Sequence, residues 1–161
     1  MKMKQEIKIK QLIAAIAIPL AVGGLSAFIT KDAMSIFEMV RKPPLSPPGW
    51  LFPVAWTILY ILMGIASYFV WNKKVSPARK ERALSFYAIQ LAANFLWSII
   101  FFSLEMYLAA FLWLVMLFLL VLVTAVLFFY IDKNAGRLMI PYALWCGFAL
   151  YLNLGVWILN R

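Results

Sequence analysis

The residues best suited to chemistry in this chain are amides, hydroxyls and indoles that fall inside long apolar runs. Three runs carry them: Tyr87, Gln90, Asn94 and Trp97 in one, Trp56, Tyr60, Met63 and Ser67 in another, and Tyr142, Trp145, Ala149 and Asn153 in a third. Each set recurs every three or four residues and therefore marks one face of a helix. Because unsatisfied amides are costly in hydrocarbon, we expect the three faces to turn inward and meet.

Two interpretations of these faces remain open. The amides could serve only to join helices through interhelical hydrogen bonds. Alternatively, the faces enclose a cavity for a flat, largely apolar ligand, since pockets combine aromatic walls with a few polar groups. The repetition of the pattern on three runs favours the cavity, and we expect Trp56, Asn94, Trp97 and Trp145 to line it. The full set of predicted ligand-binding residues is Trp56, Tyr60, Tyr87, Gln90, Asn94, Trp97, Tyr142, Trp145, Ala149 and Asn153.

The sequence lacks the residues that most other site chemistries need. It contains no histidine, so it offers no imidazole base, no His-ligated haem and no zinc site of the usual kind. The single Cys146 has no partner for a disulfide and is expected to be a small buried residue. All six acidic residues fall between the apolar runs or at their ends, which disfavours an ion-coupled transporter. We expect no metal, no required cofactor and no conventional enzyme.

The apolar runs themselves predict the fold. The chain is 66% hydrophobic and 13% charged, with a mean hydropathy of +0.91, far from the roughly 25% charged residues of soluble domains. About 20 apolar residues suffice for one membrane crossing. Five runs reach that length, at about 11–30, 49–72, 83–103, 106–131 and 138–159. The prediction is an all-α polytopic membrane protein, a five-transmembrane-helix bundle that forms a single membrane domain over residues 1–161.

The segment before the second run has an unusual proline content. Pro43, Pro44, Pro47 and Pro48 cannot belong to a helix interior, because proline fixes φ and lacks a backbone donor. We call residues 40–50 the proline collar and expect it to deliver the chain into a helix that begins near Gly49.

Basic residues predict the orientation in the membrane. The chain carries 15 Lys and Arg against six Asp and Glu, a net charge of +9. The basic residues lie at the ends of apolar runs, where topology signals and anionic-lipid contacts belong. We therefore expect lipid and not nucleic acid as a partner. Residues 1–10, 73–82 and 132–137 hold eleven of the 15. The positive-inside rule then predicts a cytoplasmic N-terminus. The first apolar run is longer than the apolar part of a typical signal peptide and four more spans follow, so we expect an uncleaved first helix, in a bacterial cytoplasmic membrane.

Three segments resemble the signature segments of the translocator protein family, whose bacterial members are called tryptophan-rich sensory proteins. They are KPPLSPPGWLFPVAWTILYILMG, FYAIQLAANFLWSIIFF and PYALWCGFALYLNLGVWILN, and they occur in the family's order over almost the whole chain. The resemblance implies a five-helix bundle that binds porphyrins such as protoporphyrin IX. It carries the family's pocket residues over to Trp56, Asn94, Trp97, Trp145 and Ala149. The family's sterol motif is absent from the end of the fifth run, where the next basic residue after Tyr151 is Arg161.

Three functions follow as hypotheses. The first is a membrane porphyrin-binding protein with a sensory, transport or detoxifying role. The second, implied by the resemblance, is light-dependent porphyrin degradation, in which Trp56 and Trp145 would be the catalytic residues. The third is a structural or partner-regulating membrane subunit whose pocket is incidental.

Small residues predict a contact between two copies of the chain. Ser85, Ala88 and Ala92 lie on a different face of the third run from the Tyr87–Gln90–Asn94 stripe. If that stripe faces inward, the small residues face outward, where close backbone approach favours helix association in lipid. We therefore expect a homodimer through the third helix, the alternative being that this face packs on another helix of the same chain.

Overall fold

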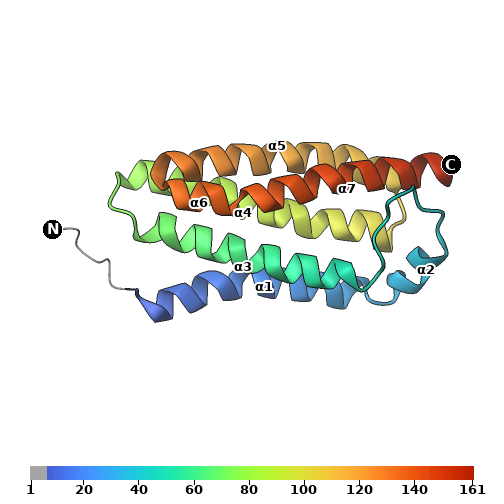
Figure 1. Cartoon of the computed structure of the whole chain (residues 1–161), viewed down its shortest axis with the longest axis horizontal. Coiled ribbons are helices and arrows are strands. Elements are labelled where there is room, and N and C mark those ends of the chain that lie inside the picture. The colour runs from blue at the N-terminus through green and yellow to red at the C-terminus, as the bar shows by residue number, and fades with distance from the viewer. Residues whose placement is uncertain (1–6) are drawn as a thin grey trace.

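Five long helices run side by side along the axis of the molecule and alternate in direction (Figure 1). The computed structural model describes residues 7–161, in which the long helices are α1 (Ile9–Thr30), α3 (Leu51–Asn72), α4 (Pro77–Ser98), α5 (Tyr107–Ile131) and α7 (Ile140–Leu159). Three short elements join them: α2 (Ala33–Met39), the π-helix η1 (Ile99–Ser103) and α6 (Lys133–Leu138). The described residues contain five spans long and apolar enough to cross a membrane. The predicted all-α, five-helix membrane bundle is confirmed.

α5 shows why the bundle belongs in lipid. Its 25 residues carry no charge, and only one stripe of them is buried, including Ala110, Leu114, Leu117 and Val121 at helical spacing. The stripe packs against α4 and α7. Large apolar side chains on the other faces, such as Leu112, stay exposed on the protein surface. Exposing that apolar surface to water would cost free energy, whereas contact with hydrocarbon does not.

The third helix begins before the apolar run 83–103, at the Ser76–Pro77 pair that is typical of a helix start. α4 starts at Pro77 after Ser76, with the proline in the first turn, where its fixed φ and missing N–H are tolerated. The charged stretch before Ala83 is therefore helical, although it lies outside the predicted apolar span. At the other end α4 continues without a break into η1, and the tight turn before α5 places Glu105 at φ 53°.

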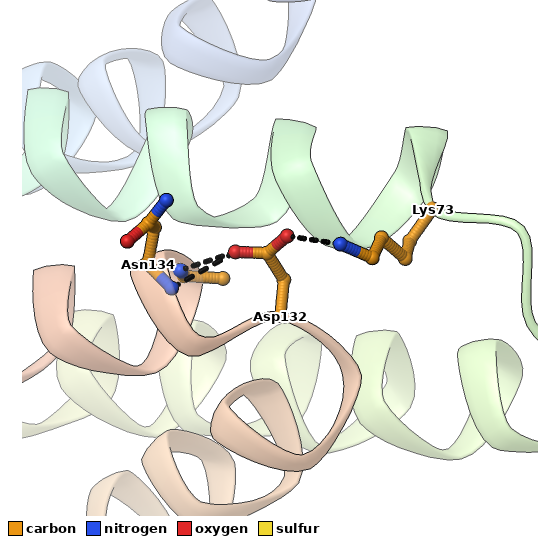
Figure 2. A network of polar contacts seen from close by, with 4 residues as sticks. Lys73, Asp132 and Asn134 are labelled. Carbon is orange, nitrogen blue, oxygen red and sulfur yellow. Dashed lines mark hydrogen bonds and ion pairs between the residues drawn. The ribbon is translucent and has the colours of Figure 1, made fainter. Parts of the chain in front are cut away.

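The linker 132–137 is also helical, because Lys133–Leu138 fold into α6, and the apolar span counted together with α6 therefore begins at Lys133. Asp132 caps this helix: its Oδ1 accepts hydrogen bonds from the backbone N–H groups of Asn134 (2.9 Å) and Ala135 (3.2 Å). Its Oδ2 lies 2.7 Å from the Nζ of Lys73, at the end of α3 (Figure 2). One carboxylate therefore orders the helix start and ties it to α3.

The pKa of Asp132 reflects these contacts. Partial burial acts to raise the pKa of the carboxyl, but the hydrogen bond from Lys73 and those from the two backbone N–H groups outweigh it. They hold the pKa below its usual value, so the group is ionised at neutral pH.

The connection between α1 and α3 is more ordered than a linker. Its first part forms α2, which the sequence did not predict, and the proline collar follows and leads into α3 at Leu51, close to the expected start. The collar is fixed to α7. Asn160 accepts from the backbone N–H of Arg41 (3.1 Å) and donates to its carbonyl (2.8 Å), while the Tyr151 hydroxyl donates to the carbonyl of Pro44 (2.7 Å). Figure 1 shows α2 and the C-terminus at the same end of the bundle.

Candidate ligand-binding cavity

A cavity of about 510 Å³ opens inside the bundle at the collar end. Its walls come from α1, α3, α4, α7, η1 and the segment between α1 and α3. Six of the ten predicted residues line it: Trp56, Tyr60, Trp97, Trp145, Ala149 and Asn153. The three aromatic faces identified in the sequence therefore meet around one hollow.

Trp56 of α3 is the centre of the aromatic wall. Its ring centroid lies 6.5 Å from that of Trp97 on α4 and 6.4 Å from that of Trp145 on α7. Tyr60, one turn further along α3, stacks on it at 5.5 Å with an interplanar angle of 28°. The indole of Trp56 thus contacts indoles from two other helices, and the apolar faces of the three rings give a flat ligand a surface on which to stack.

A layer of polar side chains lies behind this wall. Asn94 donates to the Tyr60 hydroxyl (3.2 Å), and the Tyr142 hydroxyl donates to Gln90 Oε1 (2.9 Å). Asn94, Gln90 and Tyr142 do not line the cavity. The expectation that Asn94 lies in the cavity wall is wrong: it reaches the cavity only through Tyr60. Both interpretations of the polar faces hold in part, because these side chains join helices while the aromatic residues form the wall.

Asn153 belongs to both the wall and the polar layer. Its Oδ1 accepts from the indole N–H of Trp97 (3.2 Å), and its Nδ2 donates to the backbone carbonyl of Tyr107 (2.8 Å). The side chain is 1% exposed, so these bonds satisfy an amide that would otherwise be costly in the membrane. They also fix the plane of the Trp97 ring.

Tyr87 lies apart from the cavity. Its ring packs on that of Phe128 at 5.6 Å, and it lines a second hollow of about 570 Å³ between α1, α3 and α4. Ala88 and Ala92 line the same hollow, and both are exposed on the surface of the single chain, as is Ser85. The small-residue face of α4 is therefore exposed in the single chain, at a hollow that α1 and α3 also line.

Sequence reasoning missed the contribution of α1 and of the segment that follows it. Gly23 and Ala27 of α1 line the cavity, although neither was among the predicted ligand-binding residues. Lys31 and Lys42 also line it, and no pattern in the sequence marked them. Phe101 of η1 completes the wall by stacking on Trp97 at 5.4 Å.

The groups that reach the cavity define what it can do. Aromatic rings supply stacking faces, and the lining also includes polar residues such as Tyr60, Asn153, Lys31 and Lys42. In residues 7–161 no three His, Cys, Asp or Glu side chains come together as a metal site. The arrangement is suited to binding a flat apolar molecule.

Comparison with known proteins identifies the family of the chain. The family model described as the TspO/MBR family matches residues 15–158, from within α1 to the end of α7. The chain belongs to the TspO/MBR family. The resemblance seen in the three tryptophan-rich segments is thereby confirmed, and the protein is an integral membrane protein of this family.

Relatives from archaea, bacteria and animals align with most of the chain. The chain is 37% identical to the tryptophan-rich protein TspO of Archaeoglobus fulgidus over 153 residues, which cover 94% of this chain and 98% of the relative. It is 39% identical to the tryptophan-rich sensory protein of Cereibacter sphaeroides, over 77% of this chain and 76% of the relative. It is 32% identical to the translocator protein of Homo sapiens, over 82% of this chain and 79% of the relative.

Proposed function

We propose that this protein binds a porphyrin in the cavity between α1, α3, α4 and α7, and that binding serves a sensory, transport or detoxifying role. The observation that carries the proposal is the contact of Trp56 with both Trp97 and Trp145 in the wall of one apolar hollow. A tetrapyrrole is flat, aromatic and largely apolar, so it can stack on such a wall. The family resemblance implies the same ligand class.

The proposal is tested by titrating purified protein with protoporphyrin IX and following the quenching of tryptophan fluorescence. Saturable quenching is expected, because the bound ring would lie against the indoles. For substituted proteins the porphyrin absorbance is the better readout, since removing a tryptophan removes part of the fluorescence.

Trp56→Ala and Trp71→Ala form a matched pair on α3. Trp71 lies at the far end of the helix and is 45% exposed, away from the cavity. Trp56→Ala removes a stacking partner worth on the order of 1 kcal/mol and should weaken porphyrin binding about fivefold. Trp71→Ala should leave the porphyrin affinity unchanged. Equal affinities in both would contradict the cavity as the binding site. A wild-type protein that binds no tetrapyrrole would favour the partner-regulating subunit instead.

Light-dependent porphyrin degradation is the second candidate. The observation that favours it is that Trp56 and Trp145, the residues implied for the reaction, contact each other edge to face at 6.4 Å in the cavity wall. Illumination of the complex would then remove the porphyrin Soret band, while a dark control keeps it. Trp145→Phe should slow the loss more than it weakens binding. A Soret band that is equally stable with and without protein under light supports a binder alone.

The membrane orientation is also a proposal. The end of the bundle at which α1 starts carries Lys8, Lys10, the basic residues of 73–82, Lys133 and Arg137, whereas the collar end carries Lys31, Arg41, Lys42 and Arg161. This asymmetry supports a cytoplasmic N-terminus in a bacterial cytoplasmic membrane. The cavity would then lie toward the outer face.

A further inference from the structure

The second hollow is a groove that follows α4 from the end of the bundle where that helix begins. It has a volume of about 570 Å³, and apart from Ser67 its lining residues are aliphatic or aromatic. Those on α4 run from Leu84 to Phe95, a separation of about 16 Å along the helix axis. Half of the hydrocarbon core of a bilayer is about 15 Å deep. The groove is therefore as long as one leaflet of lipid is deep.

The groove opens on the outer surface of the bundle. Ala15 of α1 and Leu91 of α4 are buried at its floor, whereas Ile18 and Leu25 of α1, which also line it, are exposed. Both helices belong to spans that can cross a membrane. Apolar surface at this place is covered by hydrocarbon and not by water, because its exposure to water would cost free energy. The groove is thus shaped to take an acyl chain of a neighbouring lipid.

A lysine lies at the end of the groove where α4 begins. Lys80 precedes Leu84 by four residues and therefore shares its face of the helix. Its Nζ donates to the backbone carbonyl of Trp71 (2.7 Å), a residue of α3 that lines the groove. Among residues 7–161 no carboxylate lies within ion-pair distance of Lys80. Since an ammonium group has three donors, two remain for an anionic oxygen at the mouth of the groove.

Other polar groups at the same end suit a lipid headgroup. Gln11 lies one turn before Ala15 on α1, and its Oε1 is buried without a hydrogen-bond partner in the described part of the chain. It can accept from a hydroxyl. Lys74 and Arg79 are exposed beside the connection between α3 and α4, at the end of the bundle where α1 also starts (Figure 1). The acidic residue nearest in sequence, Glu81, points about 100° away from Lys80 around the helix.

We propose that the second hollow binds one acyl chain of an anionic glycerophospholipid from the surrounding leaflet, with the phosphate of that lipid at Lys80. The chain lies between α1 and α4 on the floor formed by Ala15 and Leu91, and a headgroup hydroxyl donates to Gln11. This site is separate from the tryptophan-lined cavity, because the two hollows share no lining residue.

The competing occupant is a second copy of the chain. Ala88 and Ala92, which line the groove, also belong to the small-residue face on which the homodimer is proposed. Ser85 of the same face lies outside the groove, so a second copy can contact α4 beside a bound chain. The basic mouth favours the lipid, since lysine and arginine near a membrane surface attract anionic headgroups.

The experiment titrates delipidated protein in uncharged detergent with dioleoyl phosphatidylglycerol and with dioleoyl phosphatidylcholine. The two lipids have the same acyl chains but differ in net charge, and native mass spectrometry counts the lipids bound to each chain. Lys80→Gln removes the charge at the mouth of the groove, and Lys80→Arg retains it. Arg82→Gln is the matched control, because Arg82 is exposed on α4 and points about 160° away from Lys80.

A second pair of variants tests the groove itself. Val22→Phe adds bulk inside the groove from α1, whereas Ala21→Phe adds a ring at the neighbouring exposed position, outside both hollows. Circular dichroism checks that both variants are folded, and light scattering gives the mass of each. If Val22→Phe does not fold, the Lys80 variants still decide the proposal.

One phosphatidylglycerol is expected to bind per chain, about fivefold more tightly than phosphatidylcholine. Lys80→Gln should weaken phosphatidylglycerol binding about fivefold and leave phosphatidylcholine binding unchanged, whereas Lys80→Arg and Arg82→Gln stay within about twofold of the wild type. Val22→Phe should weaken the binding of both lipids several-fold, because it fills the place of the acyl chain. Ala21→Phe should weaken neither.

Equal affinities of the wild type for the two lipids would overturn the proposal, and so would a Lys80→Gln variant that binds phosphatidylglycerol as the wild type does. Equal losses in Arg82→Gln and Lys80→Gln would point to surface charge in general and also overturn it. A dimer that becomes monomeric in Val22→Phe while lipid binding persists would show that a second copy occupies the groove. None of these outcomes depends on porphyrin binding.

Discussion

The ring of Tyr60 on α3 packs directly against the backbone of Gly23 on α1, where the glycine has no side chain to hold it away. A Cβ atom built on Gly23 would lie 2.1 Å from Tyr60 Cε2 and 2.6 Å from its Cδ2. Real Cβ atoms do not approach so closely, so any larger residue must move the ring. Because the Tyr60 hydroxyl accepts from Asn94, a displaced ring also breaks a buried hydrogen bond between α3 and α4.

Gly23→Ala and Gly24→Ala form a matched pair that tests this contact. Nothing lies within 4 Å of the Cβ that alanine would add at Gly24, so this change should stabilise α1 by up to about 1 kcal/mol. Gly23→Ala should instead destabilise the protein by about 1–2 kcal/mol and weaken porphyrin binding several-fold, because Tyr60 forms part of the cavity wall. Denaturant unfolding in detergent and a porphyrin titration measure the two effects. Identical behaviour of the two variants would show that the Tyr60 ring adapts freely.

Asn153 is expected to be important for stability as well as for the cavity. Asn153→Ala leaves the indole N–H of Trp97 and the carbonyl of Tyr107 without their partner, at a cost of about 1–2 kcal/mol. Asn134→Ala is the control, because the Asn134 side chain is exposed and only its backbone N–H bonds to Asp132. Unfolding curves that coincide for the two variants would show that a bound water replaces the amide.

The Lys73–Asp132 pair predicts a pH dependence. The pKa of Asp132 is lower in the folded chain than in the unfolded one, so the ionised carboxylate stabilises the fold. This stabilisation is complete above the unfolded-state pKa of about 4 and is lost as pH falls through the folded-state pKa. The melting temperature of the wild type should therefore fall between about pH 5 and pH 3 by more than that of Asp132→Asn. Asp32→Asn, at an exposed position, should follow the wild type.

The proposed homodimer is tested at the small-residue face of α4. Ala92→Phe places a ring where two backbones would approach and should convert a dimer to a monomer in mild detergent, while porphyrin affinity stays nearly unchanged. Ala17→Phe, at an exposed position on α1 outside both hollows, controls for added bulk in lipid. Light scattering after size exclusion gives the mass. A wild-type protein that is already monomeric in mild detergent would contradict the proposed homodimer.

The orientation is tested with reporter fusions in a bacterial host. Alkaline phosphatase fused after Arg161 should be active, because the collar end is proposed to face the periplasm. A cytoplasmic reporter at the same position should be inactive. The reverse pattern would place the N-terminus outside.

The sequence predicted the five spans because their length and apolar content are set by the bilayer and not by tertiary detail. It predicted a tryptophan-lined hollow for a similar reason, since helical spacing fixes the direction in which Trp56, Trp97 and Trp145 point. Spacing does not fix depth. Asn94 points in nearly the same direction as Trp97 but lies behind Tyr60. Tyr87 lies about 15 Å from Trp97 along the same helix and lines the second hollow.

Other parts of the site had no local pattern to predict them. α2 is only seven residues long, has no side-chain cap and buries none of its residues fully. α6 depends on Asp132, whose capping role is recognisable, but also on Lys73 from 59 residues away. Lys31 and Lys42 resemble ordinary helix-end cations in the sequence, and only the tertiary fold brings them to one cavity.

The anchoring of the proline collar to α7 has a consequence for how the protein is made. Arg41 and Pro44 emerge from the ribosome more than 100 residues before Asn160 and Tyr151, the side chains that hold them. Pro43 is likewise synthesised before Gly155, the residue against which its ring packs; a Cβ on Gly155 would lie 2.5 Å from that ring. α7 also supplies Trp145, so during synthesis the earlier helices must stay in the bilayer around an unfinished wall. The complete cavity is acquired only in the last step of membrane insertion.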